Sequence, residues 1–399
     1  MQIREMRPEE HLEYRGMCKF VYHGSQREDI RGMMENPLEH QIKSDSKYWG
    51  CFGEDGRMHS AMIVNPFTIR MNGRDVKMGG IGGVITLPEY RGKAHVRRIF
   101  DTIFPTMIDA GQVFSCLYPF SYAYYRKFGY DLCYTYNECR IPINQLSGLP
   151  FPKHIEAHWP GDDISPYAQV YETFVRDRNL SMVRSQKNWD DLLKRDPYQH
   201  LEFTYLCRDE SGNGISYIMY RSEEDGRRNT LEIKEFCWSS VEGFMQMLGF
   251  MAKLSPEFKA IGWRAPHDLY VNAIFPDAQS VKLKAMPRVM NRVVDVIAGL
   301  ETLAAPGGSG QVTIDVTDTY WQSNSGAYTI AWEGGHLTAS KTQGKVPDMS
   351  VSVGTLAQLI TGYLTPSKAV YKPDTRVHSA HAGLDALFPK KKIYLMEFF

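Results

Sequence analysis

The chain has 399 residues, of which 43% are hydrophobic and 23% charged, and its formal net charge is zero. This length predicts two or three domains, and the neutral balance argues against a broad nucleic-acid surface, which needs a basic footprint. No stretch has the roughly 18 uninterrupted apolar residues of a membrane span. The amino terminus lacks the apolar core of a signal peptide, so a cytoplasmic location is expected. The seven cysteines are odd in number and form no Cys-x-x-Cys pair, which argues against a disulfide framework and a zinc ribbon.

The first region, about residues 1–150, reads as an α/β layer. A helical stretch over 8–22 precedes strands expected at 48–52, 58–64 and 74–87, and Asn72-Gly73 is a strong hairpin signal between the last two. In the helix expected after residue 94, Pro105 should cause a bend or an early end near 102–104. A strand at 113–117 and a short helix with Tyr124 and Tyr125 follow, and the segment 142–152 reads as a linker.

The most informative segment is the turn between the strand that ends near Leu87 and the following helix. This turn contains Arg91, Gly92, Lys93 and Ala94. Backbone N–H groups at a helix start point outward and the helix dipole adds positive potential, so the turn can hold a phosphate. Neither Gly-x-Gly-x-x-Gly nor a Walker Lys-Ser/Thr ending is present. The alternative interpretation is an ordinary strand-to-helix turn with a solvated basic edge.

The second region, about 151–286, repeats the order of elements in the first. Helices are expected at 165–178, 189–194 and 241–254, and strands at 202–208, 216–220 and 231–237. The basic glycine turn is missing after Trp238. We therefore interpret this region as a degenerate second copy of the fold without a cofactor.

The third region, about 287–399, differs in pattern. Apolar residues over 290–300 have helical spacing, and a Gly-rich loop follows at 305–310. Strands are expected at 312–316, 328–332 and 349–353, with helices starting near 356 and 384. A helix, an antiparallel sheet and further helices resemble the sterol-carrier-like domain, an apolar-pocket fold.

Two segments of the first region together resemble the GNAT superfamily of acetyl-CoA-dependent N-acetyltransferases. The pyrophosphate turn of that family reads Arg/Gln-x-x-Gly-x-Gly/Ala, and Arg91-Gly92-Lys93-Ala94 corresponds to it, with Ala at the last position. A later helix of the family carries Tyr-x-x-x-Gly-Phe/Tyr, which corresponds to the segment 125–130.

Over its full length the chain resembles the enhanced intracellular survival (Eis) family of bacterial acetyltransferases, whose chains end in an aromatic residue, as Phe399 does here. The resemblance implies an α+β or α/β multidomain fold: tandem GNAT-fold domains, the second degenerate, followed by a sterol-carrier-like α+β domain. The implied limits are 1–150, 151–286 and 287–399. The resemblance also implies acetyl-CoA as cosubstrate, no metal, no nucleic-acid or membrane partner, and a homo-oligomer, by family a hexamer.

The same resemblance implies a set of site residues. Tyr125 would protonate the departing thiolate as general acid, and the buried carboxylate of Phe399 would be the general base for the amine. Phe120 and Ser121 would line the pantetheine arm. Its thioester end would meet the backbone of Val84, Ile85 and Thr86. The pyrophosphate would be wrapped by Arg91, Gly92, Lys93, Ala94, His95, Val96 and Arg97.

Other roles for the key residues stay open. From the residues alone, Tyr124 competes with Tyr125, and either tyrosine could serve only in packing. A chain terminus is usually frayed, but the apolar ending of this sequence favours docking.

Two functions follow from these observations. One is acetyl-CoA-dependent N-acetylation of primary amines, on a polycationic small molecule such as an aminoglycoside or on lysine side chains. The alternative is a lipid- or acyl-binding carrier, or an acyl-CoA sensor, without transferase turnover.

Overall fold

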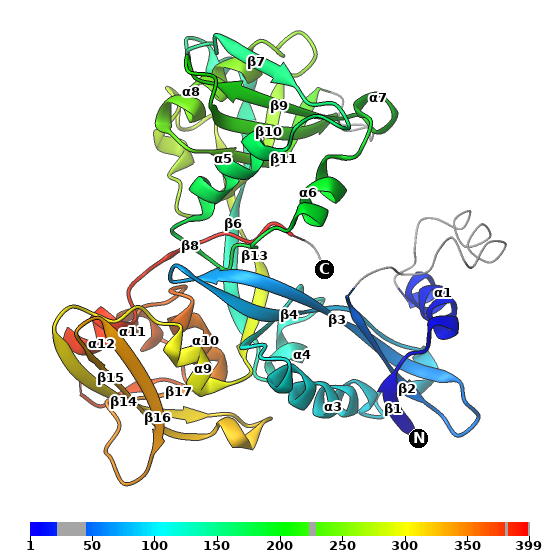
Figure 1. Ribbon diagram of the computed structural model, residues 1–399, viewed down its shortest axis with the longest axis vertical. Coiled ribbons are helices and arrows are strands. Elements are labelled where there is room, and N and C mark those ends of the chain that lie inside the picture. The colour runs from blue at the N-terminus through cyan, green and yellow to red at the C-terminus, as the bar shows by residue number, and fades with distance from the viewer. Residues whose placement is uncertain (22–44, 223–228, 380–381, 398–399) are drawn as a thin grey trace.

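The computed structural model describes residues 1–21, 45–222, 229–379 and 382–397, which form three lobes (Figure 1). We call residues 1–130 the first lobe, 143–281 the second lobe and 294–391 the third lobe. Two long strands, β6 (Asp131–Pro142) and β13 (Lys282–Val293), connect the first two lobes, and the C-terminal tail (392–397) passes between them. Within these ranges, no helix has the length and apolar character needed to cross a bilayer.

The first lobe is a sheet covered on both faces by helices. Its strands are β1 (Gln2–Glu5), β2 (Lys47–Phe52), β3 (Met58–Met71), β4 (Arg74–Thr86) and β5 (Phe114–Leu117), and β4 and β5 are parallel. Alternate strand residues point to opposite faces. Helix α1 (His11–Val21) therefore packs on Tyr48 and Ala61, whereas α3 (His95–Asp109) packs on Trp49 and Met62. The predicted hairpin is confirmed: Asn72 and Gly73 both have positive φ, 50° and 80°.

The helix α3 continues past Pro105 to Asp109, so the predicted early end near 102–104 is wrong. A proline inside a helix costs about 3 kcal/mol. The inner face of α3 buries Ile99, Ile103, Phe104 and Met107, each with at most 1% of its surface exposed. Burying each such side chain is worth about 1.5–3 kcal/mol, so packing outweighs the lost hydrogen bond.

The strands β6 and β13 join the first two lobes into one sheet. They pair antiparallel from Lys282↔Arg140 to Asn291↔Asp131. At one end β5 pairs with β13, and at the other end β12 (Ala260–Pro266) pairs with β6. The twelve strands follow the order β1-β2-β3-β4-β5-β13-β6-β12-β11-β10-β9-β7.

The second lobe repeats the plan of the first, as the sequence predicts. The parallel pair β11 (Thr230–Trp238) and β12 corresponds to β4 and β5, and α8 (Val241–Ala252) corresponds to α3. The segment expected as a linker contains the short 3₁₀ helix η3 (Ile143–Leu146), whose two apolar ends are buried in the lobe's core. The remaining elements are β7 (His154–Ala157), α5 (Ser165–Val175), β8 (Arg178–Asn179), α6 (Gln186–Leu193), α7 (Pro197–His200), β9 (Glu202–Arg208) and β10 (Gly214–Ser222).

The third lobe is a five-stranded sheet with helices on one side, in the strand order β16-β15-β14-β17-β18 (Figure 1). The helix predicted over 290–300 is wrong in its first half, because β13 continues to Val293 and α9 (Val296–Glu301) begins only after the Asp295 cap. The other elements are β14 (Ser309–Thr317), β15 (Gly326–Glu333), β16 (His336–Thr342), β17 (Met349–Ser352), α10 (Val353–Ile360), α11 (Pro366–Ala369), β18 (Arg376–Val377) and α12 (Ala382–Leu387).

Candidate functional site

The strand β4 leaves its parallel partner β5 at the centre of the first lobe. Pairing ends at Ile81↔Leu117, whereas β4 continues to Thr86. The register between β3 and β4 shifts next to Gly83, which has φ +54°, and a β-bulge bends its strand. A side chain at Gly83 would strike Tyr14 of α1, because an added Cβ would lie 1.7 Å from the phenol oxygen. Beyond Ile81 and Leu117 the two strands are no longer paired, and we call this separation the gap between β4 and β5; the bulge lies in the part of β4 that is not paired with β5.

The three residues predicted to meet the thioester lie on this segment. Ile85 is buried against α1, and Val84 packs toward the α3 side of the sheet. The buried Ser60 hydroxyl donates to the Ile85 carbonyl at 2.7 Å and lies 2.8 Å from the Thr86 hydroxyl. The segment is therefore fixed by β3 while it borders the gap.

The basic turn lies at the end of the same strand, immediately before α3. Gly92 and Ala94 both have positive φ, 76° and 60°, and Ala94 is the N-cap of α3. All four residues from Arg91 to Ala94 are exposed. The Arg91 Nε lies 3.4 Å from the Thr86 carbonyl oxygen, and the Lys93 ammonium lies 5.0 Å from the Tyr90 ring centroid. This helix start has the charge and the open backbone that an anion requires.

The predicted pyrophosphate residues in the first turn of α3 differ in their exposure to solvent. Arg97 is exposed, with its guanidinium 5.0 Å from the Tyr320 ring centroid. His95 and Val96 are buried, so only their backbone N–H groups are available at the helix start. His95 Nδ1 lies 3.4 Å from the Cys51 sulfur, and burial, together with His59, Arg98 and Lys93, lowers the pKa of this imidazole. The helical spacing could have predicted this burial, because His95 lies four positions before Ile99 and so shares its face of α3.

The predicted acid lies on the short helix α4 (Tyr122–Arg126), directly after β5. Ser121 begins the helix by accepting a hydrogen bond from the Tyr124 N–H at 3.3 Å. Tyr125 is only 2% exposed and belongs to the same apolar cluster as Ile81 and Leu117. Phe120, 70% exposed, covers it edge-on at 5.4 Å between ring centroids. The structure therefore places Tyr125 beside the point where β4 and β5 separate.

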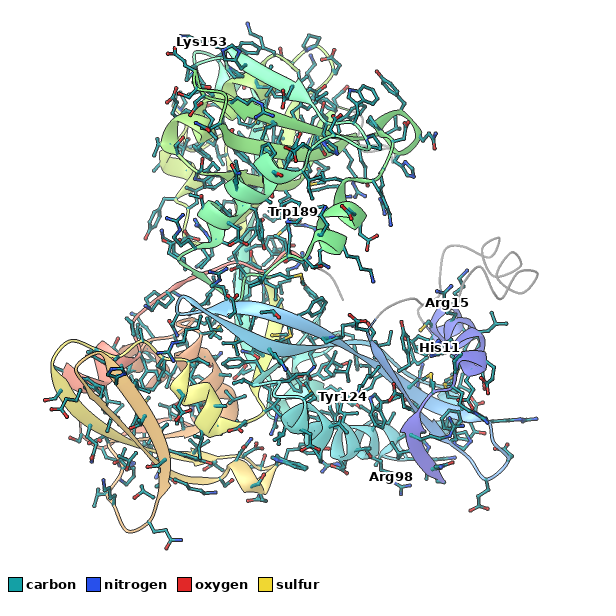
Figure 2. The ribbon with its side chains drawn as sticks, in the orientation of Figure 1. His11, Arg15, Arg98, Tyr124, Lys153 and Trp189 are labelled. Atoms are coloured by element: carbon teal, nitrogen blue, oxygen red, sulfur yellow. The ribbon has the colours of Figure 1, made fainter. Side chains whose placement is uncertain are left out.

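The competing tyrosine has a different environment. Tyr124 lies on α4 and is half-buried (Figure 2). The centroid of its ring lies 5.2 Å from that of Phe120 and 5.5 Å from that of Phe128. Burial raises the pKa of Tyr124, and the nearby Arg97 partly offsets this.

The C-terminal tail returns to the first lobe beside the same point. Its strand β19 (Lys392–Ile393) pairs in parallel with β8, and Tyr394 and Leu395 are buried. The hydroxyl of Tyr118, the residue after β5, donates to the Glu397 carbonyl oxygen. Burial raises the pKa of Tyr118 to about 12, so this phenol stays protonated and can donate at neutral pH. Phe399, the predicted base, lies outside the described residues.

A cleft of about 350 Å³ opens beside the tail, between it and the second lobe. In its wall, Arg184 donates to Glu235 at 2.9 and 2.5 Å and to Glu397 at 2.8 and 2.7 Å. Burial alone would raise the pKa of Glu235, but the charge and hydrogen bonds of Arg184, together with the Tyr217 hydrogen bond and the charge of Lys234, hold this pKa below its usual range. The second carboxylate oxygen of Glu397 is buried and accepts no hydrogen bond. Asp191 and Lys234 complete the charged lining of the cleft.

In the described part of the second lobe, aromatic side chains occupy the corresponding position. There β11 continues past its last pair with β12, Ile233↔Trp263. Aromatic rings from β11, β12 and α8 pack together at this position, with centroids 4.7 to 6.3 Å apart: Phe236, Trp238, Phe244 and Trp263. The start of α8 is capped by Ser240. The second lobe therefore differs from the first at the position that corresponds to the separation of β4 and β5.

Within the described ranges, no three His, Cys, Asp or Glu side chains converge as metal ligands.

Comparison with known families agrees with this geometry. Residues 2–133 and 180–293 both match acetyltransferase (GNAT) domains, and residues 294–396 match the sterol carrier protein domain. No protein of curated function matches the chain in sequence.

Several solved structures share the fold along the whole chain. A conserved protein of Enterococcus faecalis V583 superposes with a TM-score of 0.86 at 21% identity, covering 100% of this chain and 99% of the other. A GCN5-related N-acetyltransferase of Anabaena variabilis gives 0.84 at 18% identity, with both chains covered completely. Eis1 of Mycobacterium abscessus gives 0.79 at 18% identity, again with complete coverage of both chains.

The two GNAT matches together span more than half of the chain, which therefore belongs to the GNAT acetyltransferases, enzymes that use acetyl-CoA as cosubstrate. Within this class it has the Eis-like arrangement of two GNAT domains followed by a sterol carrier protein domain.

Proposed function

We propose that this enzyme transfers the acetyl group of acetyl-CoA to primary amines of a polycationic small molecule, aminoglycoside-like, or to lysine side chains. The observation that carries the proposal is the meeting of three features at one place. The gap between β4 and β5, the Tyr125 helix and the docked tail all adjoin the end of β5. A direct attack of the amine on the thioester needs a carbonyl-binding donor, an acid and a base there.

The cofactor would lie along β4 and end at the basic turn. The backbone of Val84, Ile85 and Thr86 would hold the thioester end, and Phe120 and Ser121 would line the arm. Arg91, Lys93 and Arg97 would supply charge to the pyrophosphate, whereas Gly92, Ala94, His95 and Val96 would contribute backbone. This division follows from which side chains of the turn are exposed and which are buried.

Tyr125 would be the general acid and the Phe399 carboxylate the general base. The docking of the tail supports the second assignment, because Glu397 is held by Tyr118 and Arg184. A terminal carboxylate would both take a proton from an ammonium group and attract a cationic substrate.

The cleft beside the tail supports a cationic acceptor. Three carboxylates, Asp191, Glu235 and Glu397, line it together with two cations, Arg184 and Lys234. The carboxylates of the lining outnumber its cations, so a substrate with several ammonium groups would meet complementary charge there.

The carrier alternative draws on the match of residues 294–396 to the sterol carrier protein domain. One cavity of the third lobe, near Leu303 and Leu387, holds about 110 Å³, whereas pockets for small ligands usually hold about 300 Å³ or more.

The proposal extends to organisation and location. We propose domain limits of 1–150, 151–286 and 287–399; the second boundary falls within β13 next to its register shift after Pro287. The family resemblance further suggests a hexamer in the bacterial cytoplasm.

The decisive experiment measures thiol release from acetyl-CoA with an aminoglycoside, a polyamine, a lysine peptide and a neutral amino sugar. We expect turnover with the cationic amines. Tyr125→Phe should lower kcat by about 100-fold or more, the usual worth of a general acid, with little change in the KM for acetyl-CoA. Tyr124→Phe is the matched control and should retain most of its activity. No thiol release with any amine, together with tight fatty-acid binding, would favour the carrier instead.

A further inference from the structure

Arg292 is the largest side chain that the described part of the molecule buries completely. It lies on β13, and its guanidinium donates to two places. One is Asp318 of the third lobe, at 2.5 Å, and the other is the carbonyl oxygen of Phe128, just after α4. The same guanidinium lies 4.5 Å from the ring centroid of Phe104, on α3. The Arg292 side chain therefore contacts α3, the backbone just after α4 and the third lobe.

A contribution to the free energy of unfolding does not by itself explain the buried pair of Arg292 and Asp318. Both side chains of the pair have 0% exposure, and the cost of removing two such charges from water often exceeds their attraction. Replacing such a pair with apolar groups is often neutral or stabilising. Gly129, just after α4, leaves no room for a side chain, because an added Cβ would lie 2.3 Å from the Arg292 Nη1. The chain after α4 is thus fitted closely around the guanidinium.

Asp318 extends the contact to the first turn of α3. Its other carboxylate oxygen accepts hydrogen bonds from the N–H groups of Tyr320 and Trp321, at 3.1 and 2.9 Å. The Tyr320 hydroxyl donates to Asp101 at 2.5 Å, and Arg97 lies over the Tyr320 ring. A loop of the third lobe therefore contacts α3 next to the proposed pyrophosphate site.

A second ion pair holds α4 through its own last residue. Arg126 donates to Asp131 at 3.0 and 3.1 Å. The other oxygen of Asp131 accepts from Lys372 of the third lobe at 2.6 Å. The third lobe is thus connected to both the helix that carries Tyr125 and the turn that follows it.

We propose that Arg292 is a positioning residue: paired with Asp318, it holds the end of α4 so that the Tyr125 phenol stays aligned with the thioester. This inference rests on the proposed role of Tyr125. It gives the third lobe a part in the reaction, as the support against which the catalytic helix is fixed.

The test compares Arg292→Met, which keeps the length and apolar stem but removes the fork of donors, with Arg292→Lys. A displacement of about 1 Å in a catalytic group can cost about 100-fold in rate. We expect kcat for Arg292→Met to fall by about 10- to 100-fold while the KM for acetyl-CoA changes less than about twofold, and Arg292→Lys to recover part of the loss. If Arg292→Met folds poorly, Asp318→Asn takes its place in the test. This variant keeps the shape of the site, and we expect the same pattern with a smaller fall in kcat.

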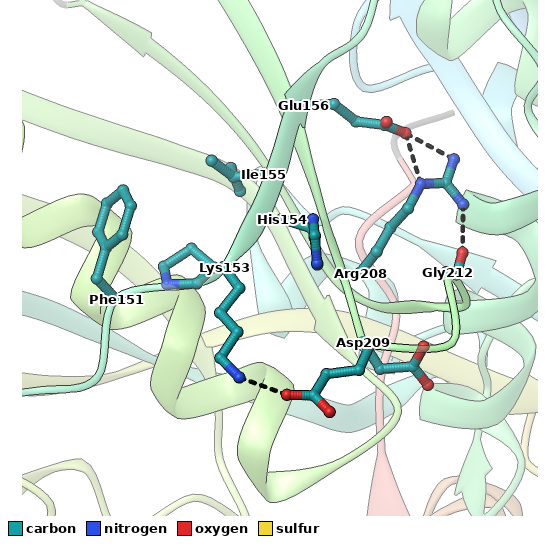
Figure 3. Close-up of a pocket in the computed structure, with 10 residues that line it drawn as sticks. Phe151, Lys153, His154, Ile155, Glu156, Arg208, Asp209 and Gly212 are labelled. Atoms are coloured by element: carbon teal, nitrogen blue, oxygen red, sulfur yellow. Dashed lines mark hydrogen bonds and ion pairs between the residues drawn. The ribbon is translucent and has the colours of Figure 1, made fainter.

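The matched control is Arg208→Met at the far end of the second lobe (Figure 3). Arg208 also joins a carboxylate, Glu156 at 2.9 and 2.6 Å, to a backbone carbonyl, Gly212 at 2.8 Å. This variant loses a comparable set of hydrogen bonds far from α4, so its kcat should stay at the wild-type value. A fall in kcat equal to that of Arg292→Met would overturn the inference.

A double variant separates this inference from the proposed function. If Arg292 acts through Tyr125, then Arg292→Met in the Tyr125→Phe background should lower kcat by less than about twofold further, because the effects of coupled residues are not additive. If Arg292→Met lowers kcat in the Tyr125→Phe background as much as it does in the wild type, the positioning role is rejected, while Tyr125 keeps its assignment as the acid. An unchanged kcat in Tyr125→Phe alone would reject the acid assignment, and this inference with it.

Discussion

The residue Ala94 occupies a backbone conformation that few side chains adopt. Its φ and ψ are 60° and 22°, the left-handed region, at the residue that begins α3. For a residue with a Cβ this conformation costs about 1–2 kcal/mol relative to glycine. Strain of this kind persists at functional sites because the surrounding structure holds it. Here the αL turn aims the first N–H groups of α3 at the proposed pyrophosphate.

Ala94→Gly should stabilise the protein. The relief of strain exceeds the added entropy of the unfolded chain, about 0.5–1 kcal/mol, so we expect a gain of about 0.5 kcal/mol. Urea denaturation provides the measurement. Ala110→Gly at the other end of the same helix is the control, because Ala110 has an ordinary φ of −77° and should lose stability with glycine. A loss of stability in Ala94→Gly as well would contradict the argument from strain.

Sequence reasoning at this scale succeeds where the signal is local. The basic turn, the Asn72-Gly73 hairpin and the α4 tyrosines all lie where the sequence predicts them. It fails for contacts between distant residues. Arg184 and Glu397 are 213 positions apart, and the sequence around either residue does not indicate that they pair. The acidic cleft was therefore invisible before the fold was known.

Among the elements, the strands β6 and β13 were the hardest to predict. The first half of β13 is largely exposed and its second half is buried on both faces, so no single period runs through it. Its buried half, read alone, has helical spacing, which explains the wrong helix prediction. By contrast, the tail was predicted to dock because its apolar residues need cover, and Tyr394 and Leu395 are indeed buried.

The tail offers a direct test at the scale of one element. A short polar extension after Phe399 should abolish turnover, because it would remove the terminal carboxylate and place polar groups beside Tyr118. The midpoint of thermal unfolding should stay unchanged, since β19 and Tyr394 lie upstream of the addition. The same extension placed before Met1 is the control and should leave turnover intact. Full activity in the C-terminally extended enzyme would reject the terminal base.

At the scale of the whole molecule, the lobes are joined by buried carboxylates as well as by strands. Asp131 on β6 pairs with Lys372 of the third lobe. Burial alone would raise the pKa of Asp131, but its hydrogen bond and charge interaction with Lys372 outweigh this and lower that pKa. A carboxyl group whose pKa is lower in the folded state stabilises the fold above its unfolded pKa of about 3.9, and this stability is lost as the pH falls through the folded value.

The stability of the wild-type protein should therefore fall more steeply than that of Asp131→Asn when the pH is lowered from about 5 toward 3. The variant starts less stable at neutral pH, so the two curves should converge in acid. Thermal unfolding midpoints across this range are the measurement. Glu210→Gln is the control: its exposed pair with Lys153 lies within the second lobe, and its curve should run parallel to the wild type. Parallel curves for Asp131→Asn would show that this contact does not contribute to the pH dependence.

The continuous ladder of β6 and β13 also limits how an acceptor can enter. Two lobes joined by a single flexible linker can swing apart, but here two paired strands connect the lobes, and a change in their relative orientation would have to bend or break this ladder. The paired strands therefore restrict the orientation of the two lobes, and an acceptor would have to reach the site between lobes held in this way.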